Sequence, residues 1–402
     1  MGGPAPLRRA DPLRGRDHGP DVFRTAPGHG AAALPGLRRA RERADPEEAR
    51  HRPALLDPLA LEGSSGVKAA VYGGPGDLEL RDWPEPVAGA GELLVRVRGC
   101  GLCGSDILKI LSPDTRAPAV FGHEVVGEVI AVGAAVTRFS VGQRVVVAHH
   151  VPCFRCHYCR RGSASMCRAF KRINLDPGGF AELCRVPAPN VEHATFALPP
   201  GMSDETASFV EPLACCLRAV KRSGAVAGDA ALVIGLGSIG CLLSQAFALA
   251  GTAVFGADLV AGRRALGRAA GARVFDVDAE LDAALSEATE GRGADVAMLT
   301  AGGGSLLPWV AARLRDGGHV HYFAGGEGAA LPLPLADLYH RELTISSTYS
   351  SSPTELREAF DALATGRIRV DGLITHRLPL GELARGVELM RRHEAVKVYV
   401  TP

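Results

Sequence analysis

The sequence contains no apolar run that approaches the ~18 residues needed to cross a membrane as a helix. It also lacks, near Met1, the apolar stretch of a secretory signal peptide, so we expect a cytoplasmic protein. Excess charge of one sign is missing too, because the formal net charge is only +1 at pH 7. Composition therefore predicts neither a nucleic-acid partner nor a membrane partner, and any recognition site has to be local.

The composition of the 402 residues is ordinary for a folded protein, with 47% hydrophobic and 22% charged residues. A chain of this length exceeds one hydrophobic core, which favours two domains. Ten cysteines are present, and four of them lie between residues 153 and 167. Such crowding is typical of metal thiolates in a reducing compartment and not of a disulfide framework.

Residues 1–66 differ from the rest, because Arg, Pro, Gly and Ala dominate and no apolar period persists. We predict disorder there. A basic arm that binds nucleic acid is the weaker interpretation, since eleven Arg face nine Asp and Glu in this segment. A third interpretation is a non-native extension, with the native chain beginning near Val67, where the first strand-like run starts.

Two patterns divide the remainder of the chain. Short β-rich runs fill residues 67 to about 200, whereas after an expected helix over 203–222 buried strands alternate with amphipathic helices, as in βαβ units. This alternation ends near residue 349, and the tail could rejoin the first domain. We therefore predict an α/β fold, with a β-rich domain of residues 67–217 and 350–402 and a doubly wound parallel-sheet domain of residues 218–349.

A glycine-rich turn stands directly after a buried strand and opens a helix. Its Gly-x-Gly-x-x-Gly pattern is typical of a Rossmann dinucleotide site, where the helix N-terminus receives the pyrophosphate. Asp258 ends the next strand, where an acid binds the ribose and repels a 2′-phosphate, which favours NAD over NADP. A helix N-cap is the competing interpretation of Asp258, and Arg263 could soften the preference. The candidate cofactor residues are Gly235, Leu236, Gly237, Ser238, Ile239, Gly240, Asp258 and Arg263.

The four crowded cysteines are Cys153, Cys156, Cys159 and Cys167, in a polar segment. Four thiolates at this spacing can close a tetrahedral zinc site that has no open position, so its role would be structural. Metal binding would then contribute directly to folding. An iron–sulfur cluster is the rival interpretation, and a coincidental cluster is disfavoured further.

A second candidate set mixes a thiolate, an imidazole and carboxylates, which together can hold zinc and leave a position for substrate. Taken singly, each member has an ordinary alternative: a buried apolar cysteine, a hydrogen-bonded histidine, or a carboxylate that caps a helix. Their coexistence with the dinucleotide turn favours a catalytic metal site. The set consists of Cys103, His123, Glu124 and Glu211.

These motifs, in this order, resemble the zinc-dependent medium-chain dehydrogenase/reductase superfamily over about residues 67–402. Glu211-Pro212-Leu213 makes the chain similar to the sorbitol (L-iditol), glucose and threonine dehydrogenase branches. The resemblance implies a GroES-like catalytic domain beside a Rossmann domain and two zinc ions per chain. It also implies small-molecule alcohol substrates and a homodimer or homotetramer.

By the same resemblance, Cys103 and His123 would bind catalytic zinc, Glu124 would be a third or exchangeable ligand, and Glu211 would bind the metal directly or through its water. Ser105 would begin a proton relay, and Phe323 would lie near the nicotinamide. Many relatives carry a relay histidine where this chain has Leu108. Proton exit then needs another route, for example through Lys109, water or the ribose hydroxyls.

The resemblance predicts an NAD(P)-linked oxidoreductase that interconverts a secondary alcohol and a ketone, on a polyol or sugar-like substrate. A cyclitol or aminocyclitol dehydrogenase uses the same chemistry and is the first alternative. A threonine 3-dehydrogenase is weaker, because that branch uses the missing histidine. A zinc-free reductase lacks this ligand set. From another class, a non-catalytic dinucleotide-binding protein would keep the fold alone.

Overall fold

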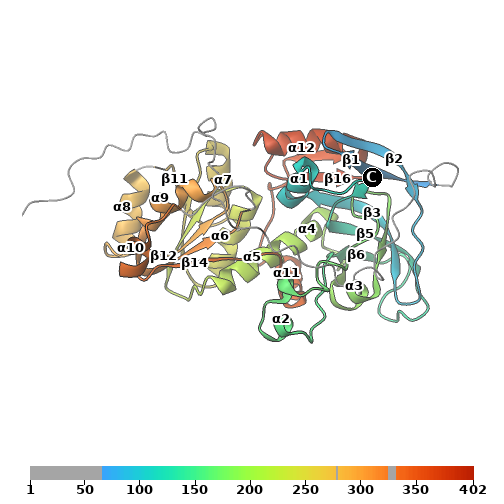
Figure 1. The fold of residues 1–402 in the computed structure, drawn as a ribbon, viewed down its shortest axis with the longest axis horizontal. Coiled ribbons are helices and arrows are strands. Elements are labelled where there is room, and N and C mark those ends of the chain that lie inside the picture. The colour runs from blue at the N-terminus through green and yellow to red at the C-terminus, as the bar shows by residue number, and fades with distance from the viewer. Residues whose placement is uncertain (1–65, 278, 325–331) are drawn as a thin grey trace, which may run out of the picture.

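The computed structural model describes residues 66–277, 279–324 and 332–402. The predictions for the N-terminal segment therefore lie outside the described residues, apart from Gly66, which opens the first strand. In the described ranges the chain forms two sheet-based halves, with helices α5 and α11 between them (Figure 1). No helix in those ranges combines the length and the apolarity that a membrane span requires.

One half holds a six-stranded sheet in which every neighbouring pair is parallel. Its order confirms the predicted doubly wound fold, because the first strand lies between the second and the fourth. The strands, in spatial order, are β11 (Arg273–Phe275), β10 (Ala253–Ala257), β9 (Ala230–Ile234), β12 (Ala294–Leu299), β13 (Leu314–Tyr322) and β14 (Thr344–Ser347).

The other half is β-rich and mostly antiparallel, as expected. A three-stranded sheet consists of β2 (Asp77–Pro84), β1 (Gly66–Gly74) and β4 (Ala119–Val120). The larger sheet follows the path β15 (His376–Pro379), β16 (Val398–Thr401), β3 (Leu93–Leu102), β5 (Glu124–Val132), β6 (Arg144–Val147) and β8 (Thr195–Ala197), with β7 (Leu183–Val186) paired to β3. Since β16 pairs with β3, the C-terminal tail returns to the first half.

Helices cover these sheets and join the halves. Within the described residues the α-helices are α1 (Gly104–Leu111), α2 (His157–Arg160), α3 (Ala188–His193), α4 (Asp204–Ser208), α5 (Val210–Arg222), α6 (Ser238–Leu249), α7 (Ala261–Ala269), α8 (Ala279–Ala288), α9 (Leu307–Ala311), α10 (Leu335–His340), α11 (Pro353–Ala364) and α12 (Leu383–Arg391). Short 3-10 helices occupy Ala164–Met166, Gly304–Leu306 and Leu380–Glu382.

The single helix expected over 203–222 is wrong, because the structure has two helices, α4 and α5, that meet at Phe209. Pro212 explains the break. Its ring would clash with the carbonyl of Ser208 four residues earlier, and it has no N–H to donate. The new helix start places Glu211 in the first turn of α5.

One apolar cluster connects the two halves. It contains Val146 from the β-rich sheet, Leu213 from α5, Val233 from the parallel sheet and Leu356 from α11, all buried. Helix α5 packs against both α6 and α11. Burial of this shared core fixes α5 relative to both sheets, which matters because α5 carries candidate site residues.

A ladder of polar side chains links β13 to β14 and the residue after it. The Nε2 atom of His319 lies 2.5 Å from the Ser346 hydroxyl, which lies 2.7 Å from Nδ1 of His321. The Nε2 atom of His321 lies 2.9 Å from the Thr348 hydroxyl. Both histidines are thus hydrogen-bonded residues of the fold. Burial lowers the pKa of His321 to about 4.

The His321→Asn variant should reduce the loss of stability on acidification. Because the folded-state pKa lies below the unfolded value, the unfolded chain binds more protons between about pH 6.5 and 4, and stability falls as pH drops through that window. For wild type this group costs about 2 kcal/mol at pH 5. Thermal unfolding from pH 7 to 5 measures it. His340→Asn, at an exposed position, is the control, and identical profiles for wild type and His321→Asn would contradict the prediction.

Candidate metal centres and dinucleotide site

Three of the four predicted catalytic ligands come together where β3 ends and β5 begins. Cys103 follows β3 as the N-cap of α1, and His123 and Glu124 stand at the start of β5. One ligand atom of each lies within 4.8 Å of the others. A thiolate and an imidazole are ligands that zinc prefers, so the donor chemistry of this group fits the metal.

Asp106 orients His123, a role that sequence analysis missed. Its Oδ1 lies 3.1 Å from Nδ1 of His123, and its Oδ2 accepts the Cys103 backbone N–H at 3.2 Å. Burial opposes ionisation of both partners, but their mutual attraction outweighs it, lowering the pKa of Asp106 and raising that of His123. With Nδ1 engaged, Nε2 is the nitrogen left for a metal.

Glu124 is ion-paired with a lysine from the far end of the described chain. Lys397 Nζ lies 2.6 Å from Oε1 and 2.5 Å from Oε2 of Glu124, and both residues are buried. Burial opposes the charge on Lys397, yet the Glu124 carboxylate and Cys103 raise its pKa overall. In the sequence this lysine stands directly before the last strand, β16, and no motif marks it.

Glu211 is not part of the close group, although it is buried nearby on α5. Its Oε1 accepts a hydrogen bond from the Cys215 thiol at 3.4 Å. Burial raises the pKa of Glu211, the charge of His123 lowers it and that of Glu124 raises it again. These three influences place Glu211 in the electrostatic field of the cluster, so its contact with metal or metal-bound water stays a prediction.

Two further side chains surround the cluster. The Ser105 hydroxyl donates to the Cys103 sulfur at 3.4 Å, which places it beside a metal ligand as expected. The His149 ring centroid lies 4.5 Å from that of His123, and its buried Nδ1 has no hydrogen-bond partner among the described residues. Sequence analysis did not single out His149, because a histidine after a buried strand carries no motif.

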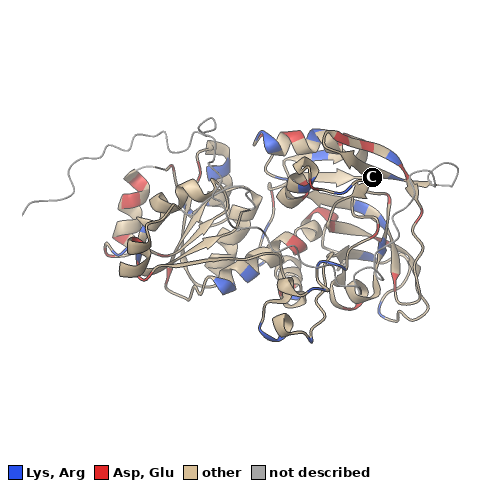
Figure 2. Cartoon of the chain, viewed as in Figure 1, with Lys and Arg blue, Asp and Glu red and all other residues tan. Residues whose placement is uncertain are grey.

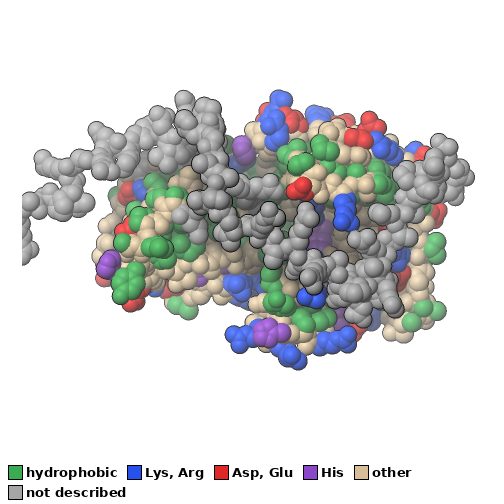
Figure 3. Space-filling model, in the orientation of Figure 1, with side chains coloured by type: hydrophobic (Ala, Val, Ile, Leu, Met, Phe, Trp, Pro, Cys, Tyr) green, Lys and Arg blue, Asp and Glu red, His purple; other side chains and the backbone are tan. Residues whose placement is uncertain are grey.

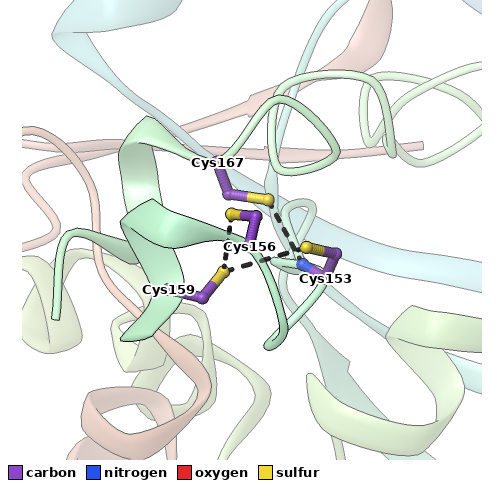
Figure 4. A group of neighbouring side chains, drawn as sticks. All are labelled: Cys153, Cys156, Cys159 and Cys167. Atoms are coloured by element: carbon purple, nitrogen blue, oxygen red, sulfur yellow. Dashed lines mark hydrogen bonds between the residues drawn. The ribbon is translucent and has the colours of Figure 1, made fainter. Parts of the chain in front are cut away.

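The second cluster gathers the four crowded cysteines. Figure 4 shows their sulfurs turned toward one another, and all four lie within 4.8 Å. Measured sulfur pairs are 4.0 Å for Cys153 with Cys159 and 3.5 Å for Cys156 with Cys159. A zinc–sulfur bond of about 2.3 Å implies tetrahedral sulfur separations of about 3.8 Å, so this group fits zinc. Backbone N–H groups of Arg155 and Cys156 lower the pKa of Cys153 to about 6.

The glycine-rich turn joins β9 to α6 as predicted. Gly235 has a φ of +92°, in the left-handed region. A Cβ on Gly240 would lie 1.8 Å from the Gly235 oxygen, so only glycine permits this approach of helix and turn. A Cβ on Gly237 would meet nothing within 4 Å, which leaves space for a pyrophosphate above Ser238 and Ile239 at the helix start.

Asp258 is held against this turn. Its Oδ2 accepts the Leu236 N–H at 2.7 Å and its Oδ1 accepts the Val260 N–H at 2.8 Å. A carboxylate oxygen has further lone pairs, so ribose contact remains compatible with these bonds. Arg263 donates to the His393 carbonyl at 3.3 Å. Phe323 follows β13, and its N–H donates to the Leu299 carbonyl at 2.8 Å.

Comparison with known proteins gives two matches to family models. Residues 89–195 match the alcohol dehydrogenase GroES-like domain, and residues 238–365 match the zinc-binding dehydrogenase model. These ranges span the two candidate metal clusters and the helix of the dinucleotide turn. Both predicted domain types are therefore confirmed.

Individual relatives and a solved structure point to the same family. A sorbitol dehydrogenase of Halalkalibacterium halodurans is 29% identical, over 82% of this chain and 97% of its own length. An erythritol/L-threitol dehydrogenase of Mycolicibacterium smegmatis is 30% identical, over 84% and 98%. The structure of a zinc-binding dehydrogenase from Sinorhizobium meliloti bound to NADP is 30% identical, covers 84% of this chain and 100% of its own, and has a TM-score of 0.75.

Removing one thiolate from the four-cysteine group should reduce the stability of the fold and leave the zinc at the catalytic group in place. We expect Cys156→Ser to lower the zinc content from two ions to one and to reduce Tm or soluble yield, because metal binding there contributes to folding. Metal analysis and thermal unfolding measure both effects. Cys184→Ser, a buried cysteine of the same half outside the cluster, should keep two zinc ions. A Cys156→Ser protein with two ions would contradict the assignment.

Lys397→Met should destabilise the chain by about 3–5 kcal/mol, because it leaves Glu124 buried without its partner. Urea unfolding of the zinc-loaded protein measures the loss. Lys68→Met is the matched control, since Lys68 pairs with Asp82 at the surface and such pairs contribute about 0–1 kcal/mol. Glu124→Gln added to Lys397→Met should recover part of the loss, and a double variant less stable than Lys397→Met would contradict the ion-pair explanation.

Proposed function

The chain belongs to the zinc-dependent medium-chain dehydrogenase/reductase superfamily, and on that premise we propose that it interconverts a secondary alcohol and a ketone on a polyol or sugar-like substrate. It is an NAD(P)-linked alcohol oxidoreductase that uses zinc. The observation that carries the proposed chemistry is the close group of Cys103, His123 and Glu124, which offers a thiolate, an imidazole and a carboxylate to zinc. The polyol substrate class is supported by the similarity to a sorbitol dehydrogenase and an erythritol/L-threitol dehydrogenase.

In this proposal Cys103 and His123 would hold the catalytic zinc, and Asp106 engages Nδ1 of His123, which leaves Nε2 as the ligand atom. When bound, zinc supplies a Lewis acid that favours ionisation of the alcohol, and the nicotinamide supplies the hydride acceptor. Ser105, whose hydroxyl donates a hydrogen bond to the Cys103 sulfur, would accept the substrate hydroxyl proton at Oγ and release its own hydroxyl hydrogen to water.

The two carboxylates have different tasks. Lys397 neutralises Glu124, which keeps this third ligand available for exchange without leaving a bare charge in the interior. Glu211, in the first turn of α5, would bind the metal directly or through its water. Because the side chain at residue 108 is leucine and 44% exposed, proton exit beyond Ser105 uses water or cofactor hydroxyls.

For the cofactor, we propose a preference for NAD. The buried carboxylate of Asp258 is fixed by two backbone N–H groups at the end of β10, where its charge opposes a 2′-phosphate. Arg263 is engaged with the His393 carbonyl, which limits its use as a phosphate ligand. The exposed edge of the parallel sheet at β14 supports assembly as a homodimer or homotetramer.

Cys103→Ser and His123→Ala should abolish turnover without unfolding the chain. Each removes a proposed zinc ligand, and both residues are anchored by backbone structure at the end of β3 and the start of β5. The assay is NAD reduction across a panel of polyols and cyclitols, with metal content and Tm recorded for each variant. Cys184→Ser is the control for loss of a thiol elsewhere. Full activity in either ligand variant would end the zinc-based proposal.

A further inference from the structure

A buried arginine on α5 has no carboxylate partner in the part of the chain that the structure describes. Arg218 is 5% exposed and forms no ion pair with any described residue. Among the described residues its guanidinium donates to two backbone carbonyls, of Tyr349 and Gly162, both at 3.3 Å. The nearby Glu355 carboxylate is instead paired with Lys221. A buried guanidinium that has only neutral acceptors carries an uncompensated desolvation free energy, which a bound anion would offset.

Arg218 lies on the same face of α5 as the candidate metal-site residue Glu211. Seven residues separate them, which corresponds to two helical turns and about 10 Å along the axis. The Tyr349 backbone accepts from Arg218, and the charges of His123 and Glu211 act on the Tyr349 phenol. These contacts connect the guanidinium to Tyr349 and to the four-cysteine lobe, residues 153–175, which contributes Gly162.

The lobe adds further positive charge on this side. Residues 153–175 contain six Lys and Arg and no Asp or Glu. Figure 2 shows this charge around α2, and Figure 3 shows Lys and Arg side chains at that edge of the surface. The Nζ atom of Lys171 lies 4.8 Å from the Tyr349 ring centroid. Tyr349, itself half exposed, thus has one cation at its backbone and another over its ring.

We propose that the substrate carries an anionic group, a carboxylate or a phosphate, which binds Arg218 and Lys171 beside Tyr349 while the reacting hydroxyl lies at the Cys103–His123 group. The inference rests on the proposed function and specifies its substrate class. Arginine offers a planar fork that matches either anion, and lysine adds a mobile point charge. Burial lowers the pKa of Arg218 despite the attraction of Glu355, which agrees with a cation that lacks a counter-charge.

The test compares three six-carbon compounds: sorbitol, gluconate and sorbitol 6-phosphate, with the zinc-loaded enzyme and NAD. We expect wild type to prefer at least one anion over sorbitol in kcat/KM, and the preferred anion identifies the group. Arg218→Gln should reduce that preference by about tenfold or more, mainly through KM, because a charge-assisted contact is worth about 1.5–3 kcal/mol. Arg218→Lys should restore part of it.

The matched control is Arg222→Gln, an exposed arginine one turn further along α5, which should leave the preference unchanged. Equal kcat/KM for all three compounds in wild type would overturn the proposal. An equal loss of kcat/KM for all three compounds in Arg218→Gln would also overturn it, because Arg218 would then have a structural role that links the lobe to Tyr349. If Arg218→Gln fails to fold, Lys171→Gln replaces it, and an unchanged preference there counts against the site.

Calorimetry separates this inference from the proposed function. If no compound is oxidised, the proposed function fails, and binding of gluconate or sorbitol 6-phosphate to the zinc-loaded chain decides the anion site. Binding to wild type that weakens about tenfold in Arg218→Gln, but not in Arg222→Gln, sustains it. No binding of either anion, or equal binding to both variants, overturns it.

Discussion

The buried attraction between Glu124 and Lys397 is the constraint on which the catalytic group depends. It joins the start of β5 to the residue before β16, and β3, which ends beside Cys103, lies between those two strands. Each charge alone would be costly in this interior, whereas the pair is tolerated because neither is left uncompensated. The attraction thereby ties the start of β5 to the start of β16, beside the candidate catalytic ligands at the end of β3.

Helix α5 connects this group of residues to the half of the molecule that holds the parallel sheet. Its first turn bears Glu211, and later turns bear Cys215 and Arg218, while its apolar face joins the core shared with α6 and α11. Because both sheets pack against the same helix, the candidate metal ligands and the dinucleotide turn are fixed relative to each other. The helix begins where it does because Pro212 prevents it from continuing α4.

Local patterns in the sequence predicted the parts that are encoded locally. The glycine turn, the four-cysteine lobe and the alternation of strands and helices each occupy a short stretch whose spacing carries the chemistry. Asp106, His149 and Lys397 escaped prediction because their roles arise from contacts across the fold. Lys397 lies 273 residues from its partner, and nothing local distinguishes it from a surface lysine. The prediction of one helix over 203–222 was wrong because it followed the apolar periodicity and neglected the effect of Pro212 on the backbone.

The histidine ladder between β13 and β14 has one more property. Ser346 has a single hydroxyl hydrogen, so it can donate to His319 or to His321 but must accept from the other. If Ser346 donates to His321, then Nε2 of His321 carries hydrogen and donates to Thr348; in the opposite case Thr348 is the donor. The tautomers of both rings therefore change together. The chain of hydrogen bonds from His319 to Thr348 has two arrangements, in which every donor and acceptor is exchanged. If the Thr348 hydroxyl changes from acceptor to donor, the hydrogen-bond direction at His319 therefore reverses as well.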